Sequence, residues 1–400
     1  MGRPADLLTG LHVAVDGVGL TRPWAGVGVY TTQILRAMAV ERPDCRFTIY
    51  VPGLPATRGG RLRPGTGRSR EGRLELPISE GVEGSRSISY RQIPNIPFIG
   101  RHVQWPARLR RLKPDVFFGA AGALPLMDVG SPSVITVHDL AIYRHAGWFP
   151  PRQPLSTRWV VPSSLSRADR VIAVSSNTAR DTEELFGVPR SRIAVVPHGV
   201  SPGLRPMSGE ELAAVRERFQ LPERFVLFVG TIEPRKNLLT LLEAWAMMRE
   251  RPDLVIVGGW GWNYEPIRER IGRLGDKVHH LDAVEPTDLP AIYNLARVLA
   301  HPAWYEGFGL PPLEAMACGT PVVVSDSSSL PEVVGDAGLV VAAGDADAWR
   351  QALEKVLGDQ DLAADLRRRG ILRAAEFSWA RSAAMTWGVI DEAVHEGAGG

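Results

Sequence analysis

The sequence predicts an α/β protein of two Rossmann-like, doubly wound domains, each with a parallel sheet between layers of helices. The chain has 400 residues, of which 44% are hydrophobic, and a single core usually stops growing beyond roughly 250–300 residues. Short β-rich segments alternate with helical patterns throughout, which is typical of parallel sheets. A Pro/Gly break at residues 202–206 interrupts this alternation and marks the junction between the domains.

The first half contains seven strand candidates, which are short segments rich in valine, isoleucine and phenylalanine. They lie at residues 11–18, 46–51, 87–93, 115–120, 133–140, 170–175 and 192–200. Helical patterns follow Gly26, Phe98, Pro154 and Ser175. The last pattern is the clearest, because a serine or asparagine cap precedes it and Gly187 ends it.

The second half contains six strand candidates, each followed by a helical pattern. They lie at residues 225–230, 254–259, 278–282, 297–303, 321–326 and 338–344. We predict a first domain at 1–200, a second at 201–376, and a terminal helix at 377–400 that is a candidate to cross back to the first domain. Open parallel sheets bind ligands at the carboxyl ends of their strands, so two such domains predict an interdomain cleft.

Composition narrows the function and the compartment. The net charge of +2 at pH 7 does not favour nucleic-acid binding, so we expect a small-molecule partner. The only cysteines are Cys45 and Cys318, which excludes a disulfide framework and fits a reducing compartment. No apolar segment approaches the roughly 18–20 residues that cross a bilayer, and residues 1–17 lack the pattern of a signal peptide. We therefore expect a cytoplasmic protein.

Residues 57–73 form a local basic segment with six arginines and one glutamate among glycines. This composition is typical of a solvated, partly disordered surface loop. The alternative is a patch for an anionic acceptor, or for peripheral association with anionic lipid on the inner face of a membrane. The sequence leaves both open.

Residues 306–314, EGFGLPPLE, predict an anion site. Glu306 follows an apolar strand, and Pro311 and Pro312 favour the first turn of a helix, which places Glu314 in that turn. Unpaired backbone N–H groups at such a helix start can bind one anion together. The residues that offer them are Gly307, Phe308, Gly309 and Leu310.

A second anion site is predicted after the first strand of the second domain. Gly230 allows a close backbone approach, and Arg235 and Lys236 precede a helix that begins near Asn237. An isolated Arg-Lys pair at a helix start is usually only two solvated surface side chains. Its position at the same sheet edge as the EGFG segment favours a diphosphate ligand instead.

The two glutamates suit a nucleotide sugar, because such a molecule carries hydroxyl groups on both sides of its diphosphate. In a Rossmann-type site, a carboxylate binds the ribose by accepting hydrogen bonds from its hydroxyl groups. We therefore expect Glu314 to hold the ribose and Glu306 to hold the transferred sugar. The alternatives are a helix-capping role for Glu306 and a solvent-facing position for Glu314, favoured by the helix dipole.

Residues 306–326 resemble the E-x7-E signature of the retaining family-four glycosyltransferases, which have the GT-B fold, and residues 228–245 resemble their diphosphate-binding segment. The resemblance continues through four other segments of the first half, 16–38, 136–150, 174–188 and 195–200. It implies that Arg235 and Lys236 neutralise the leaving nucleoside diphosphate.

The resemblance also assigns roles in the first domain. A lone histidine is more often structural, but the family places one at His138, near the transferred sugar. His138 is expected to orient the sugar through a hydroxyl or through its own backbone carbonyl, with Asp139 holding that loop or the imidazole. Gly26 and Gly28 are expected to let the N-terminal loop approach the phosphates or the acceptor.

The family retains the anomeric configuration, and a front-face mechanism is expected, in which the departing diphosphate oxygen takes the acceptor's proton. Catalysis would then be mostly electrostatic, and no metal or other cofactor is expected. A D-x-D pattern, Asp345 and Asp347, resembles a metal-binding motif but begins a helical pattern, so we interpret Asp345 as a helix N-cap.

Aromatic and proline residues at 148–150 resemble the mannosyltransferase-type branch, which makes GDP-mannose the first donor candidate; UDP- and dTDP-sugars remain open. The alternatives are a phosphorylase or sugar-phosphate synthase of the same fold, and a non-enzymatic two-domain sugar-binding protein. A pyridoxal-type phosphorylase needs a lysine beside the phosphate, and only Lys236 qualifies. The acceptor, a saccharide, a lipid-linked sugar or a natural product, is expected to bind loops around 54–84, 94–105 and 143–158.

Overall fold

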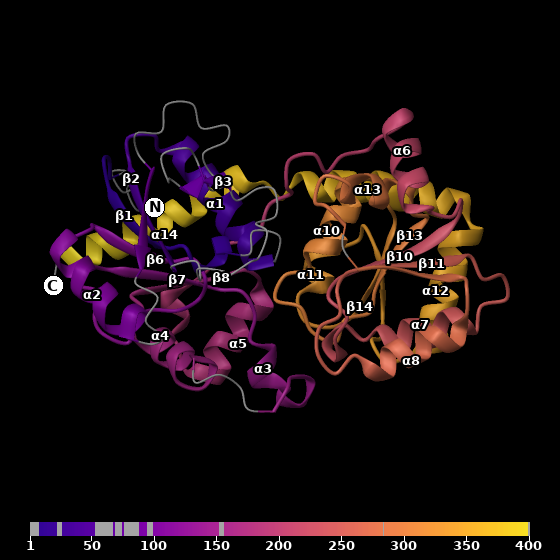
Figure 1. Cartoon of the computed structure of the whole chain (residues 1–400), viewed down its shortest axis with the longest axis horizontal. Helices are drawn as coiled ribbons and strands as arrows, with labels where there is room; N and C mark the ends of the chain where they lie inside the picture. The colour runs from indigo at the N-terminus through magenta and orange to yellow at the C-terminus, as the bar shows by residue number, and fades with distance from the viewer. Residues whose placement is uncertain are drawn as a thin grey trace.

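The structure is a computed structural model that describes residues 8–21, 26–52, 67–68, 74–75, 88–93, 99–151, 156–282 and 284–398. Two α/β domains lie side by side, each built around a parallel sheet (Figure 1). The predicted fold class is therefore confirmed. None of the helices in these residues is long and apolar enough to span a membrane.

The first domain has a seven-stranded sheet in the order β5-β2-β1-β6-β7-β8-β9, with all neighbours parallel. The strands are β1 (His12–Asp16), β2 (Arg46–Pro52), β5 (Ile88–Ile93), β6 (Val116–Gly119), β7 (Ser133–Val137), β8 (Arg170–Ala173) and β9 (Ile193–Val195). Each coincides with a predicted strand. The central strands are buried along their length because helices cover both faces of the sheet.

A short antiparallel pair, β3 (Gly67–Arg68) and β4 (Leu74–Glu75), falls in and just after the predicted basic loop 57–73. The rest of that loop lies outside the described residues, so neither interpretation of it is tested. The helices of this domain are α1 (Gly26–Glu41), α2 (Trp105–Leu112), α3 (Ala141–Arg144), α4 (Val161–Arg167) and α5 (Ser176–Phe186).

The cap residues at the two ends of helix α5 confirm its predicted boundaries. The Ser175 side chain accepts a hydrogen bond from the Thr178 amide at 3.0 Å, as an N-cap does. Gly187 has a φ of +64° and ends the helix in the left-handed conformation.

The second domain has a six-stranded parallel sheet in the order β12-β11-β10-β13-β14-β15. Its strands are β10 (Phe225–Val229), β11 (Asp253–Val257), β12 (Val278–Leu281), β13 (Val298–His301), β14 (Val322–Ser325) and β15 (Leu339–Val341). In chain order this is the 3-2-1-4-5-6 arrangement of dinucleotide-binding sheets, which changes direction between β10 and β13. Ligands of such sheets bind at the carboxyl ends of the strands that flank this switch point.

Helices cover both faces of the second sheet (Figure 1). They are α6 (Glu210–Phe219), α7 (Leu238–Ala246), α8 (Glu265–Leu274), α9 (Leu289–Leu295), α10 (Leu310–Ala317), α11 (Leu330–Val334), α12 (Ala346–Gly358) and α13 (Gln360–Ala375). Asp345 accepts a hydrogen bond from the Ala348 amide at 2.9 Å and caps α12, as predicted.

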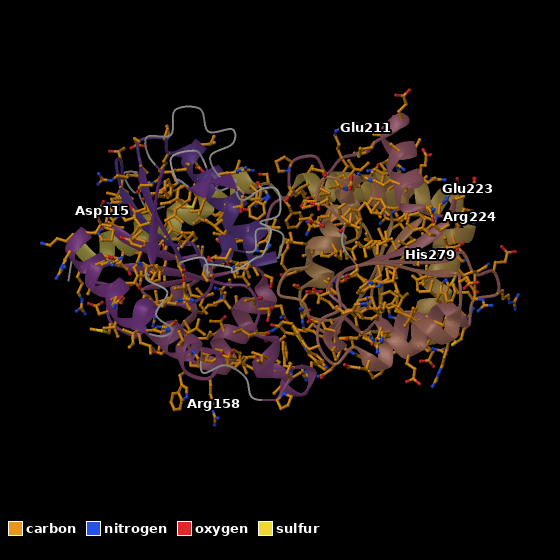
Figure 2. The ribbon with its side chains drawn as sticks, viewed as in Figure 1. Asp115, Arg158, Glu211, Glu223, Arg224 and His279 are labelled. Carbon is orange, nitrogen blue, oxygen red and sulfur yellow. The ribbon has the colours of Figure 1, made fainter. Side chains whose placement is uncertain are left out.

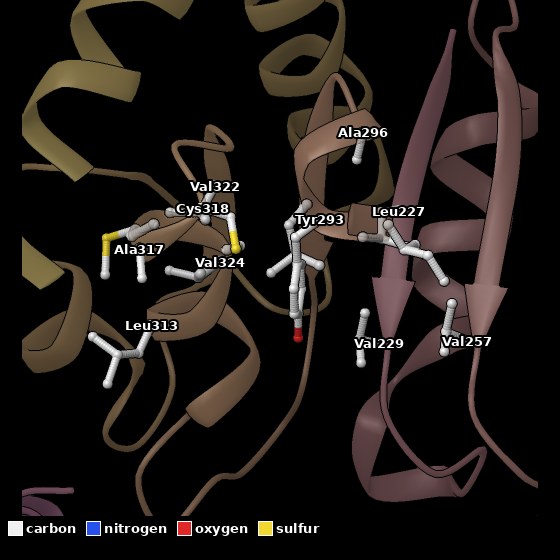
Figure 3. Packing of buried hydrophobic residues seen from close by; sticks show 14 of the residues in the cluster. Leu227, Val229, Val257, Tyr293, Ala296, Leu313, Ala317, Cys318, Val322 and Val324 are labelled. Carbon is white, nitrogen blue, oxygen red and sulfur yellow. The ribbon is translucent and has the colours of Figure 1, made fainter. Parts of the chain in front are cut away.

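Tyr293 brings a hydroxyl group to the edge of the second domain's core (Figure 3). Tyr293 is fully buried among aliphatic residues such as Leu227, Val229 and Val257. Its hydroxyl points out of this cluster, along the direction of the β10 and β11 arrows (Figure 3). The hydroxyl therefore reaches the carboxyl edge of the sheet.

The terminal helix α14 (Trp379–Ala398) leaves the second domain and packs against α1 and β8 of the first (Figure 1). Trp387 is buried there and donates to the Met38 carbonyl at 3.2 Å, and Asp391 pairs with Arg42 at 2.6 Å. At the crossing, a Cβ on Gly199 would lie 2.2 Å from the Trp379 nitrogen. The two segments that join the domains therefore touch each other.

Candidate functional site

The carboxyl ends of the two sheets meet at the domain boundary. A Cβ placed on Gly307, after β13, would lie 1.6 Å from the backbone oxygen of His138, after β7. The Thr178 hydroxyl in α5 donates to the Gly307 carbonyl at 3.0 Å. The sequence-predicted segments from both halves of the chain are thus brought together, and only glycine fits at this contact.

Glu306 lies at the centre of a buried ionic cluster. One carboxylate oxygen accepts from Lys236 Nζ at 2.5 Å and from His301 Nε2 at 2.8 Å, and the other accepts from Arg235 at 3.1 Å. Burial by itself would raise the pKa of Glu306, but Lys236 and Arg235 outweigh it and hold this pKa well below its usual range. Glu306 is therefore ionised. Its carboxylate brings together Arg235 and Lys236, the two cations that are predicted to bind a diphosphate.

This contact was not predicted from the sequence, and the alternative role of Glu306 as a helix cap is wrong. The residue before α10 is Gly309, whose φ of +108° requires glycine. The Glu306 side chain points to the cations instead.

Two further members of the cluster were missed, Glu233 and His301. Glu233 is buried and binds the Arg235 guanidinium at 2.7 and 2.9 Å. His301 is fully buried at the end of β13, and burial lowers its pKa although its bond to Glu306 opposes this. Both follow or end strands at the switch point, which is the signal that could have identified them.

The backbone after β10 is built to present Lys236. Asn237 adopts the left-handed conformation (φ +54°), which asparagine tolerates, and its side-chain amide donates to the Pro302 and Ala343 carbonyls. Gly230 has a φ of +151°, and a Cβ on it would lie 3.7 Å from the Lys236 side chain. This is an ordinary van der Waals distance, and the close approach of a ligand to Gly230 stays a prediction.

Serines after β14 hold the EGFG loop. The Glu306 amide donates to the Ser328 hydroxyl at 2.8 Å, and Ser329 donates to the carbonyls of Glu306 and Phe308 at 3.0 and 2.7 Å. Among the described residues, none accepts a hydrogen bond from the backbone N–H groups of the predicted anion site. These groups belong to Gly307, Phe308, Gly309 and Leu310. They remain available to a ligand at the start of α10.

Glu314 faces the same edge from α10. The sequence predicted Glu314 in the first turn of this helix. Because the helix begins at Leu310, Glu314 lies in its second turn instead. It is partly buried, so its predicted solvent-facing alternative is wrong, and it accepts a hydrogen bond from the Tyr293 hydroxyl at 2.8 Å. Burial raises the pKa of Glu314, and the Tyr293 bond partly opposes this.

His138 faces its own domain through its ring and the second domain through its carbonyl. Nε2 lies 2.7 Å from the Ala120 carbonyl, so Nε2 carries a proton, and burial lowers the pKa of His138. The ring packs edge-on against Tyr30, with centroids 4.7 Å apart. Asp139 accepts from the Ala141 amide at 3.2 Å and so holds the loop, not the imidazole.

The predicted glycines of the N-terminal loop have different surroundings. Gly28 is buried within α1, whereas Gly26 is exposed at its start, and no atom lies within 4 Å of a Cβ placed on Gly26. No described contact therefore requires glycine at position 26. Residues 22–25, which precede it, lie outside the described part of the chain.

Two family models match the chain, glycosyltransferase family 4 over residues 24–204 and glycosyl transferases group 1 over residues 211–373. The O-antigen chain mannosyltransferase B of Escherichia coli is 36% identical over 255 residues, which cover 62% of this chain and 67% of that protein. The chain therefore belongs to the glycosyltransferases that these two models describe. The D-inositol 3-phosphate glycosyltransferase of Salinispora tropica is 34% identical over 301 residues, 70% of this chain and 62% of that protein.

The glycosyltransferase spans a smaller share of some other relatives. The serotype-specific mannosyltransferase WbdA of Escherichia coli is 31% identical over 235 residues, which cover 55% of this chain but only 28% of that protein. Among solved structures, the sucrose-phosphate synthase of Thermosynechococcus elongatus superimposes with a TM-score of 0.71 at 22% identity, over 94% of this chain and 97% of that one. That likeness supports the GT-B fold of this glycosyltransferase.

Proposed function

We propose that the chain is a retaining glycosyltransferase that moves a sugar from a nucleoside-diphosphate sugar to a hydroxyl acceptor. The observation that carries the proposal is the convergence of Arg235, Lys236 and Glu306 with the free N–H groups at the start of α10. Two cations and a helix start suit a diphosphate. Carboxylates on either side suit the hydroxyl groups of a sugar and a ribose.

The bound donor changes the partners of Glu306. In the structure this carboxylate neutralises Arg235 and Lys236. A diphosphate brings its own negative charge to the two cations, which frees oxygen lone pairs of Glu306 for hydroxyl groups of the transferred sugar. Glu314 then binds the ribose hydroxyls. The domains touch at Gly307, so they must separate to admit the donor and close again over it.

The transfer follows a front-face course. The bond between the anomeric carbon and the diphosphate oxygen breaks, the acceptor oxygen bonds to the same face of that carbon, and the departing oxygen takes the acceptor's proton. Arg235, Lys236 and the N–H groups of α10 stabilise the charge that grows on the leaving group. The two cations do this without a metal ion or another cofactor.

GDP-mannose is the first donor candidate, because the relatives include proteins named mannosyltransferases. UDP- and dTDP-sugars remain alternatives, and the acceptor class stays a saccharide, a lipid-linked sugar or a natural product. The phosphorylase alternative loses support because its only candidate lysine, Lys236, is bound to Glu306.

Proton NMR of donor turnover tests the stereochemical part of this proposal. Purified protein with GDP-mannose and EDTA should release mannose, or form a glycoside, with the α configuration of the donor before mutarotation. Initial formation of the β anomer contradicts retention. Turnover that disappears with EDTA and returns with a divalent cation contradicts the metal-independent course.

His301→Phe should raise the KM for the donor about 10- to 100-fold, because a hydrogen bond to a charged group contributes roughly 1.5–3 kcal/mol. His301 donates to the ionised Glu306, and phenylalanine keeps the ring that stacks on Phe228 but not the donor. Steady-state kinetics gives the KM, and calorimetry with GDP alone should show near-normal affinity because GDP lacks the sugar. His301→Gln, which can donate, should recover part of the loss.

A matched control is His279→Phe. His279 pairs with Asp253 at 2.7 Å on β12, on the side of the second domain away from the first (Figure 2). This substitution should leave the KM unchanged. Equal losses of GDP and donor affinity in His301→Phe would show a merely structural role for His301.

A further inference from the structure

Helix α5 lies on the side of the first domain that faces the second domain (Figure 1). The Ser176 amide at its start donates to the Glu332 carboxylate in α11, at 2.9 and 3.2 Å from the two oxygens. Farther along the helix, Asp181 accepts a hydrogen bond from the Tyr305 hydroxyl at 2.5 Å. Tyr305 directly precedes Glu306 of the ionic cluster, so this second bond across the domain boundary ends beside the candidate site.

Asp181 is buried and is held by partners from its own domain. Arg144 of α3 donates twice to one carboxylate oxygen, at 2.6 and 2.9 Å, and Asn177 donates to the other oxygen at 3.2 Å. None of these three bonds involves the second domain, and Arg144 compensates the carboxylate charge. Asp181 is therefore an acceptor that the first domain has already formed before Tyr305 reaches it.

Tyr305 is buried and connects Asp181 to Arg235 through its two polar groups. Its hydroxyl donates to Asp181, and its backbone carbonyl accepts from the Arg235 guanidinium at 2.8 Å. Burial raises the pKa of Tyr305, and the hydrogen bond to Asp181 raises it further, so the hydroxyl stays protonated and donates. One residue thus joins a first-domain carboxylate to a cation that is proposed to bind the diphosphate.

The bond between Tyr305 and Asp181 forms only while the two domains are in contact, because each domain supplies one partner. Separation of the domains exposes both polar groups to water, and closure buries them together. A hydrogen bond to a charged acceptor is stronger than one between neutral groups. Closure therefore fixes Tyr305, and through the Tyr305 carbonyl it restrains the Arg235 guanidinium.

We propose that Tyr305 is a positioning residue that couples domain closure to the diphosphate site. When the domains close over the donor, Asp181 fixes Tyr305, and Tyr305 holds Arg235 where negative charge grows on the leaving oxygen. In the open form Arg235 lacks this restraint, so the donor is protected from cleavage until the domains have closed. This inference rests on the proposed function, because it assigns Arg235 to a departing diphosphate.

Kinetics of Tyr305→Phe tests this coupling, because the substitution keeps the ring and the backbone carbonyl and removes the hydroxyl. We expect kcat to fall about 10- to 100-fold, the loss typical of a buried hydrogen bond to a charged group. The affinity for GDP, measured by calorimetry, should stay near that of the wild type, because the nucleotide enters the open form. Hydrolysis of GDP-mannose without acceptor should fall by the same factor as transfer, because Arg235 acts on the leaving group.

Two further backgrounds, Asp181→Ala and Arg235→Ala, separate positioning from a general loss of structure. Tyr305→Phe should lower kcat little further in either of them, because each breaks the same connection. If Asp181→Ala does not fold, the Arg235→Ala background decides alone. The matched control is Tyr90→Phe in β5, whose buried hydroxyl has no hydrogen-bond partner within the described part of the chain, and which should keep wild-type kcat.

Two results would overturn the inference and leave the proposed function intact. The first is a wild-type kcat in Tyr305→Phe. The second is a loss in Tyr305→Phe that multiplies fully with the loss in Arg235→Ala, because independent effects are additive in free energy. Absence of donor turnover by the wild type would instead contradict the proposed function, and the inference with it.

Discussion

Replacing Lys236 by alanine is expected to lower kcat about 10²- to 10³-fold at saturating donor, the loss typical of removing one preorganised donor from a transition state. Lys236 is buried and reaches the centre of the ionic cluster with its ammonium group. In the proposed mechanism, its charge is needed most when negative charge grows on the departing diphosphate. Release of GDP from GDP-mannose, followed with a coupled assay, measures this effect.

Lys277→Ala is the matched control. Lys277 is exposed, donates to the Arg251 carbonyl at 3.0 Å, and precedes β12 at the amino end of the same sheet. It should keep wild-type turnover. Near-normal kcat in Lys236→Ala would show that the cluster does not stabilise the leaving group, and the assigned role of Lys236 would be lost.

Replacing Gly307 by alanine is expected to lower kcat about 100-fold, because a displacement of about 1 Å is enough for such a loss. The new methyl carbon would lie 1.6 Å from the His138 oxygen, a contact that only separation of the domains can relieve. The Thr178 bond to the Gly307 carbonyl would be lost with it. Steady-state kinetics gives kcat, and small-angle X-ray scattering should show a larger radius of gyration than the wild type.

Gly272→Ala in α8 provides the comparison, since nothing lies within 4 Å of a Cβ at that position and alanine favours a helix. It should change neither kcat nor the radius of gyration. If Gly307→Ala turns over normally, the contact between the domains is not part of the catalytic geometry.

The fold could be predicted from the sequence because its signals are local. Buried parallel strands are continuous apolar segments, and caps such as Ser175 and Gly187 mark helix ends within a few residues. The site could be located because loops that follow parallel strands share one edge of the sheet. That rule placed Arg235, Lys236 and Glu306 together, and the structure joins them by hydrogen bonds.

The partners within the site could not be predicted in the same way. Whether Glu306 caps a helix or binds two cations depends on atoms that are 70 residues apart in sequence. In the sequence, His301 and Glu233 look like ordinary residues near strand ends. Their role depends on burial, because a buried polar group needs a hydrogen-bond partner and the sequence does not show that they are buried. The contact between Gly307 and His138 depends on how the two domains meet, which no local pattern encodes.

The most direct test of the donor site is calorimetric titration of the purified protein with GDP-, UDP-, ADP- and dTDP-sugars, in EDTA, with Glu314→Ala in parallel. We expect one nucleotide sugar, with GDP-mannose first, to bind in EDTA and to lose its affinity in the variant, because the role proposed for Glu314, whose carboxylate accepts from Tyr293 at the sheet edge, is to bind the ribose hydroxyls. Binding of none of these donors, or unchanged affinity in Glu314→Ala, would contradict the assignment of this edge as a nucleotide-sugar site.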